Sequence, residues 1–198
     1  MTDQDLFALA MAEIAEHGWL GFNLSSLATA PEKKRKALSL ADIYDRFPTK
    51  CALLDGFGRH IDRQMIDVAA SEMTDSSPKE RIFELLMRRF DALQSMKPGL
   101  KRLYDERHCD PALMLATARN LGRMAQWLVA LSNPSLKGLR RTLAEKAIAA
   151  LYVRCFAVWL TDETDDSAKT MAEMDKRLGQ LERLAQFGAR RSQDSEAA

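Results

Sequence analysis

The sequence has few of the residues that break helices or cross-link chains. Its 198 residues include six prolines, nine glycines and three cysteines. With so few breakers, Ala, Leu, Met, Arg, Lys and Glu dominate long stretches, and these residue types favour helix. The cysteines Cys51, Cys109 and Cys155 are odd in number and widely spaced. That argues against a disulfide framework or a zinc site and is typical of reduced cysteines in a cytosolic protein.

The sequence also lacks long apolar runs and a large net charge of either sign. No stretch approaches 18 uninterrupted apolar residues, so no transmembrane helix is expected. The acidic start Met-Thr-Asp-Gln-Asp lacks the pattern of a signal peptide, and we therefore expect a cytoplasmic protein. The formal net charge of +1 gives no general attraction to nucleic acid or to an acidic membrane.

Apolar periodicity and helix-start signals predict an all-α chain. The N-terminal third is predicted to hold three short helices and the beginning of a longer one, over residues 3–17, 24–30, 40–47 and 50–70. Gly18 is expected to end the first of them. Ser39 is placed to cap the third, with Asp42 completing a capping box. Three short helices leading into a long one are typical of a helix-turn-helix head joined to a helical body.

The same signals predict a body of about five to six helices. Beyond the long helix they run from Pro78 to the break at Lys97-Pro98-Gly99, from there to about residue 107, and over 111–131, 137–161 and 165–187. We therefore expect a head at 1–50, a ligand-binding and dimerisation body at 51–190, and a disordered tail at 191–198.

The last two predicted helices each carry a narrow apolar seam. Its residues recur every four positions in one helix and at alternating steps of three and four in the other, which is typical of helix–helix packing. Pairing with a symmetry mate would make a four-helix bundle, so we expect a homodimer. The predicted interface is Leu143, Leu151, Trp159, Met171, Met174, Leu178 and Leu181.

The body is rich in aromatic residues and methionine. Packed helices of this composition often enclose an apolar pocket, which predicts an apolar small molecule or a lipid as ligand. The residues assigned to the pocket are Phe83, Met87, Phe90, Met124, Trp127, Leu128, Tyr152 and Phe156. A filled core in which methionine closes gaps is the alternative interpretation.

Residues 12–61 resemble the TetR/AcrR family of bacterial transcriptional regulators. The resemblance is carried by Ala12, Glu16 and Gly18, by Leu27-Ala28, and above all by Leu40-Ala41-Asp42-Ile43-Tyr44-Asp45-Arg46-Phe47-Pro48-Thr49-Lys50. It implies a TetR-like fold and a homodimer that binds double-stranded operator DNA. It also implies that Tyr44 and Lys50 contact phosphates, and that Ser39, Leu40 and Asp42 face the major groove.

Three features of the head depart from that pattern. A segment of Pro-Glu-Lys-Lys-Arg-Lys lengthens the turn before the third helix, and Asp42 and Asp45 place acid on its outer face. The first 63 residues hold eight Lys and Arg against nine Asp and Glu, a net charge of −1. The basic run Lys33, Lys34, Arg35 and Lys36 is predicted to contact phosphates, with a solvated loop as the alternative. For Tyr44 the alternative is a half-buried aromatic that packs the head against the long helix.

Residues 81–93, together with 158–162, 169–171 and 175–178, resemble TetR-fold proteins of ubiquinone biosynthesis. That resemblance implies lipid or isoprenoid binding without DNA binding. The leading hypothesis is therefore a ligand-responsive TetR-like regulator, a repressor, and the alternative is a lipid-binding accessory protein. A purely structural dimer has no positive support.

Catalysis, metal binding and a cofactor are not expected. The histidines His17, His60 and His108 stand alone, and His108-Cys109-Asp110 are neighbours whose side chains do not face one another. The acidic cluster from Asp162 to Asp166 lies at a turn between helices, where capping and solvation explain it better than calcium.

Overall fold

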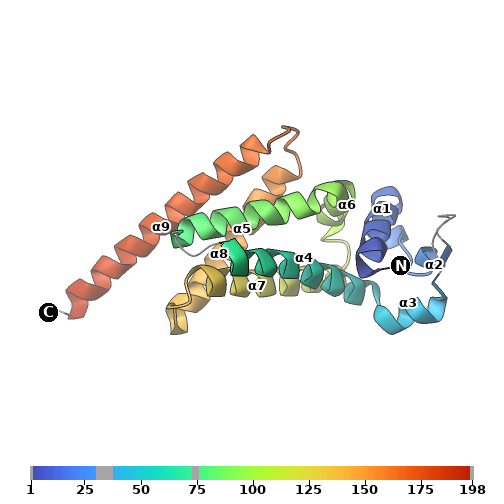
Figure 1. Ribbon diagram of the computed structural model, residues 1–198, viewed down its shortest axis with the longest axis horizontal. Helices are drawn as coiled ribbons and strands as arrows, with labels where there is room; N and C mark the ends of the chain where they lie inside the picture. Colours follow the sequence, from blue (N-terminus) through green and yellow to red (C-terminus); the bar gives the residue numbers. More distant parts are fainter. Residues whose placement is uncertain (1, 30–37, 73–75, 197–198) are drawn as a thin grey trace. The chain divides into compact units, whose positions relative to one another are not determined.

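The computed structural model describes residues 2–29, 38–72 and 76–196, with side chains omitted at 29, 68–72 and 186–196. Within those ranges every α or β element is a helix, which confirms the predicted all-α class (Figure 1). The elements are α1 (Asp3–Gly21), α2 (Ser26–Thr29), α3 (Leu40–Arg46), α4 (Lys50–Glu72), α5 (Pro78–Leu93), the 3-10 turn η1 (Gln94–Met96), α6 (Lys97–Glu106), α7 (Pro111–Ser132), α8 (Gly138–Trp159) and α9 (Ala168–Glu196).

The chain divides into two compact units. The head unit comprises Met1–Met65 and Asp91–Arg123, and the body unit comprises Ile66–Phe90 and Met124–Ala198. The division runs through α4, α5 and α7, so each of these helices contributes to both units. The head predicted at residues 1–50 therefore lies inside a larger head unit that also holds α6 and the first half of α7.

Two helix ends differ from the sequence-based expectation. The backbone leaves helical geometry at Gly18, as predicted, with φ of 73° and ψ of 170°, but another turn carries α1 on to Gly21. The last helix, α9, reaches Glu196 and so runs through most of the segment predicted as a disordered tail. Arg191, Gln193 and Glu196 in that segment are good helix formers, which favours its helical backbone.

The core of the head unit lies between α1 and the helices packed on it. Leu6, Ala10 and Ile14 of α1 are fully buried at successive turns. Backbone of α1 lies directly on α6, because a Cβ built on Gly99 would come within 3.0 Å of the carbonyl carbon of Met11. A side chain has no room at this crossing, so glycine is required there for packing.

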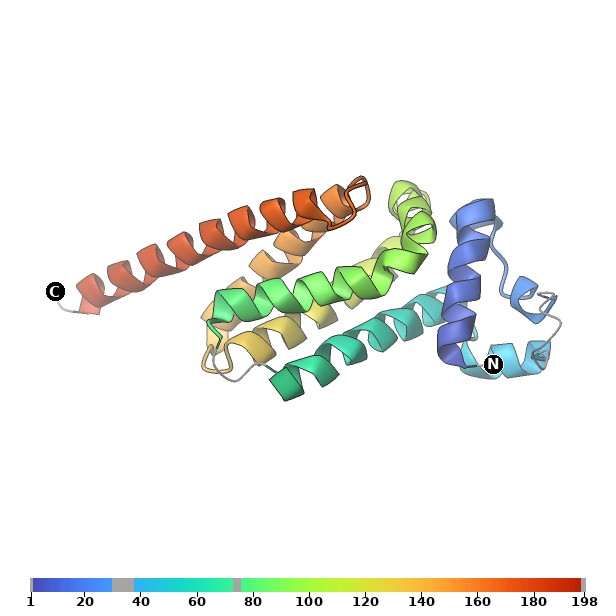
Figure 2. The same cartoon turned by 45° about the horizontal axis from the view of Figure 1, so that its top comes forward.

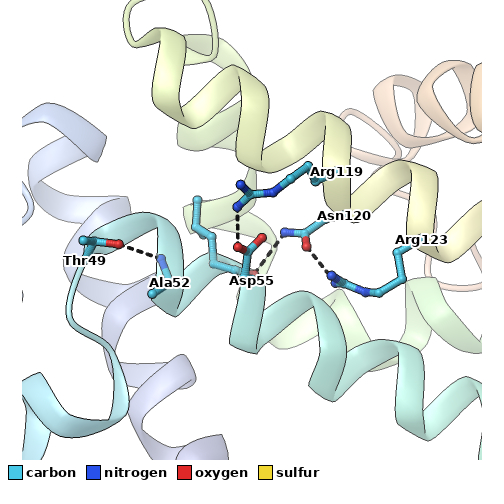
Figure 3. A network of polar contacts seen from close by, with 7 residues as sticks. Thr49, Ala52, Asp55, Arg119, Asn120 and Arg123 are labelled. Carbon is cyan, nitrogen blue, oxygen red and sulfur yellow. Dashed lines mark hydrogen bonds and ion pairs between the residues drawn. The ribbon is translucent and has the colours of Figure 1, made fainter.

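A polar network joins the first half of α4 to the first half of α7 inside the head unit (Figure 3). Arg119 forms an ion pair with Asp55, and Asn120 Nδ2 donates to the carbonyl oxygen of Leu54 at 3.1 Å. Arg123 donates to Asn120 Oδ1 at 2.6 Å and to Asp62 Oδ2 at 3.0 Å. These contacts hold the first half of α4 against α7. Because α4 follows α3 in the chain, they fix the end of the segment that carries α3.

In the body unit α8 and α9 run back along each other from the turn that joins them (Figure 2). Asp162, in that turn, is only 3% exposed. Its carboxylate accepts hydrogen bonds from the backbone and hydroxyl groups of both Thr164 and Thr170. Capping, as expected from the sequence, therefore accounts for Asp162.

Candidate nucleic-acid interface and ligand-binding core

The start of α3 is fixed by a capping box, as predicted. Ser39 Oγ accepts from the backbone nitrogen of Asp42 at 3.1 Å, and Asp42 Oδ2 accepts from the backbone nitrogen of Ser39 at 3.0 Å. Ile43 and Phe47, four residues apart, are 2% and 5% exposed and anchor the helix on the head core. Asp42, which the family resemblance implies would face the major groove, thus has its carboxylate engaged in starting the helix.

A second side of α3 is open to solvent. Leu40 is 60% exposed and Tyr44 is 66% exposed. The alternative of a half-buried Tyr44 packed against the long helix is therefore wrong. A large apolar residue and a phenol, left exposed one turn apart, form a surface that is available to a partner.

The two described cations beside α3 are both engaged inside the head unit. Lys50 Nζ donates to the carbonyl oxygens of Trp19 at 2.8 Å and Phe22 at 3.2 Å, and lies 4.7 Å from the centroid of the Trp19 ring. Arg46 pairs with Asp3 at 3.1 Å. A phosphate contact by Lys50 stays a prediction. Lys33, Lys34, Arg35 and Lys36 lie outside the described residues.

Trp19 is the centre of a polar junction that sequence reasoning missed. Its indole Nε1 donates to Asp110 Oδ2 at 2.7 Å, and its backbone nitrogen donates to Glu106 Oε2 at 2.8 Å. The indole hydrogen bond is the main reason that the pKa of Asp110 lies below its ordinary value. The left-handed backbone of Gly18 directs the Trp19 amide at Glu106. A tryptophan directly after a predicted helix break was the only signal available in the sequence.

Three of the residues assigned to the ligand pocket, Phe90, Tyr152 and Phe156, lie together with Trp159 in an aromatic cluster of the body unit. Phe90 stacks on Tyr152 and on Trp159, with ring centroids 5.4 Å apart in both pairs, and Phe156 is 5.7 Å from Tyr152. Arg89, which the sequence did not single out, is 8% exposed and its Nε donates to Tyr152 Oη at 3.3 Å.

The other predicted pocket residues differ in exposure. Met124 and Leu128 are fully buried, and Phe83 and Met87 are half-buried. Trp127, by contrast, is 45% exposed and presents its ring to solvent. The assignment of these residues to a ligand pocket stays a prediction.

Four residues of the predicted dimer interface are buried within one chain. Leu151, Trp159, Met174 and Leu178 are between 0% and 4% exposed, because they fill the body core. Leu143 is 60% exposed, and Met171 and Leu181 are half-buried. On α8 the exposed apolar residues lie on the side away from the buried Leu151 and Trp159. Besides Leu143 they include Leu139 and Val153, which are 75% and 40% exposed.

The described ranges contain neither a candidate metal cluster nor a helix that could span a membrane. No group of three or more His, Cys, Asp or Glu side chains there is arranged to hold a metal ion. None of the helices in those ranges combines the length and hydropathy needed to cross a bilayer.

Within the described residues, a small helical head that carries the short capped helix α3 and a helical body together define an all-α protein of two units. No family model matches the sequence, and no curated protein matches it. Among solved structures, the TetR transcriptional regulator from Nitrosomonas europaea ATCC 19718 is similar, with a TM-score of 0.71 and 23% identity over 91% of this chain and 98% of that chain. The chain therefore has the TetR fold, as the resemblance at residues 12–61 implies.

Proposed function

We propose that the chain is a TetR-like transcriptional regulator, a repressor that binds operator DNA through α3 as a homodimer and responds to an apolar ligand. The observation that carries this proposal is the open face of α3. A capping box and two buried anchors hold the helix, while Leu40 and Tyr44 are left more than half exposed. The recognition helix of helix-turn-helix proteins enters the major groove in this way.

The charge balance of the sequence supports phosphate contacts by the basic run at residues 33–36. The first 63 residues have a net charge of −1, and Arg46 and Lys50 are engaged within the head unit. The basic run Lys33 to Lys36 directly precedes α3 in sequence and supplies four of the eight cations. DNA binding should therefore depend on this run and weaken steeply with salt, since counterion release supplies the affinity.

Tyr44→Ala is expected to weaken binding to the DNA upstream of the chain's own gene by about tenfold at low salt, since a hydrogen bond to a charged phosphate is lost. Gel retardation with the full-length protein measures this change. Leu20→Ala, which truncates a 63% exposed residue of α1, is the matched control and should bind like the wild type. No retardation by the wild type, even at low salt, would contradict DNA binding itself.

The exposed side of α8 supports the homodimer. Leu139, Leu143, Ala150 and Val153 are exposed and share one side of the helix, with one charged residue, Lys146, among them. Large exposed apolar residues in such a row favour packing against another helix. We therefore assign the dimer face to this side of α8 rather than to the residues buried beneath it.

Leu143→Glu is expected to convert a micromolar solution of the protein from dimer to monomer, since the new carboxylate would be buried without a partner at the symmetric interface. Sedimentation velocity reports the change. Leu115→Glu on α7 provides the control, because Leu115 is equally exposed at 60% and lies in the head unit. A dimer that persists in Leu143→Glu would place the interface elsewhere.

The aromatic cluster supports the ligand. Phe90, Tyr152, Phe156 and Trp159 offer stacking surface, and Arg89 with the Tyr152 hydroxyl adds a polar end. An apolar molecule with one polar group would match an aromatic surface that has one polar end. Its binding would regulate DNA affinity only if the two states of the protein bind it differently.

A second candidate, a lipid- or isoprenoid-binding accessory protein, is favoured by one observation. Lys50 and Arg46 are both bonded to other groups of the head unit, and Asp45 places an exposed carboxylate on α3. A head that no longer binds DNA would tolerate both features. If the wild type fails to retard DNA at low salt, a lipid retained by the purified protein in native mass spectrometry would support this candidate.

A further inference from the structure

The buried anchors of α3 determine which of its residues point away from the head. Successive residues of an α-helix are about 100° apart around the axis. Ile43 faces the core and is 2% exposed. Ala41 and Asp45, two residues before and after it, therefore point to the opposite side, and both are exposed. Leu40 and Tyr44 line one flank of this outer face.

The outer face of α3 presents apolar side chains and a carboxylate to a partner, and no cation among the described residues is available on it. In the described part of the chain, Arg46 pairs with Asp3 and Lys50 donates to carbonyl oxygens of α1. Asp42 is bonded to Ser39 in the capping box. No hydrogen bond or ion pair within the described residues engages the Asp45 carboxylate. The groups that α3 can offer outward are thus the Asp45 carboxylate and the side chains of Leu40, Ala41 and Tyr44.

We propose that α3 reads pyrimidines, with Asp45 accepting a hydrogen bond from the N4 amino group of cytosine and Leu40 and Ala41 contacting the methyl group of thymine. This inference rests on the proposed function of DNA binding. A carboxylate can only accept, and cytosine N4 is a donor in the major groove. Guanine presents two acceptors there, which repel a carboxylate and are usually read by Arg or Lys.

Helix geometry sets the spacing of the two bases. Ala41 and Asp45 are four residues apart, about 6 Å along an α-helix at 1.5 Å per residue. Base pairs rise by about 3.4 Å. Each half of the operator should therefore hold a thymine and a cytosine about two base pairs apart, and a symmetric dimer would repeat the pair in both halves.

Selection of randomised duplex DNA with the full-length protein at low salt tests this specificity. The wild type is expected to enrich cytosine at one position of each half-site and thymine about two base pairs away. Asp45→Asn should move the preference at the first position from cytosine to adenine, by about tenfold in relative affinity, because an amide pairs with adenine N6 and N7. Replacing the selected thymine by uracil removes only the methyl group. It should weaken binding by the wild type several-fold and by Leu40→Ala less.

Glu16→Gln is the matched control for charge. Glu16 is exposed on α1, away from α3, so its neutralisation changes the net charge of the head by the same amount as Asp45→Asn. It is expected to leave every base preference unchanged. An unchanged cytosine preference in Asp45→Asn would overturn the inference while the proposed DNA binding stands. If the wild type enriches no sequence and retards no DNA, the proposed function itself fails.

Discussion

Gly99→Ala is expected to lower the free energy of unfolding by about 3 kcal/mol, at the upper end of what overpacking costs in a close-packed core. The added Cβ would lie within 3.0 Å of the Met11 carbonyl carbon and 3.1 Å of its Cα. These are backbone atoms in the middle of α1, so they cannot rotate aside as a side chain would. Relief requires α1 and α6 to move apart, and that opens the core of the head unit.

Thermal and urea unfolding followed by circular dichroism measure this effect, which corresponds to a decrease in Tm of about 6 to 12 °C. Gly122→Ala is the matched control on α7, because a Cβ there meets nothing within 4 Å. It should raise stability by up to about 1 kcal/mol through helix propensity alone. Wild-type stability in Gly99→Ala would show that α1 and α6 pack less closely than the structure describes.

Asp162→Asn is expected to lower the free energy of unfolding of the body unit by about 3 kcal/mol at pH 7. The Asp162 carboxylate accepts at 2.7 and 2.8 Å from Thr170 and at 2.6 and 3.1 Å from Thr164. An amide nitrogen at either oxygen position would face two donors. Two hydrogen bonds to a charged group would be lost, each contributing about 1.5 to 3 kcal/mol.

Asp162→Asn should also remove a contribution to the pH dependence of the free energy of unfolding. Burial pushes the pKa of Asp162 upward, but the hydrogen bonds from Thr164 and Thr170 outweigh it and hold the pKa well below the ordinary 3.8. At pH below about 4 the unfolded chain takes up a proton at this aspartate before the folded chain does. The stabilisation is therefore complete above that range and is lost as the pH falls.

Urea unfolding from pH 7 down to pH 3 would show the gap between wild type and Asp162→Asn narrowing as the pH falls. Glu163→Gln, at the exposed neighbouring residue, is the control and should follow the wild type throughout. A gap of constant size would mean that the ionised carboxylate is not the source of the stability.

Local signals in the sequence predicted most of the helices. The capping box of Ser39 and Asp42, the proline-led start of α5 and the cap of α4 by Thr49 were all readable, because each involves residues three or four apart. The resemblance in the segment from Leu40 to Lys50 likewise pointed to the TetR fold that the structure shows.

The exposure of individual residues could not be predicted in the same way. An apolar residue at every fourth position from Leu143 through Leu151 to Trp159 identified a packing seam, but the spacing is the same whether a seam faces its own chain or a second copy. The structure buries Leu151 and Trp159 in the body core and leaves Leu143 open. Tyr44 had two interpretations for the same reason, and its 66% exposure excludes the buried one.

By itself the sequence determined that this protein is all-α, where most of its helices begin and end, and that α3 belongs to a TetR-like head. Hydrophobic periodicity, helix caps and helix breakers each involve residues only a few positions apart, so they can be recognised in the sequence alone. Only the tertiary structure decided that Lys50 and Asp110 converge on Trp19, that Arg89 joins the aromatic cluster, and which face of α3 is open. These pairings join residues between 31 and 91 positions apart, and no local pattern encodes which distant partner a side chain meets.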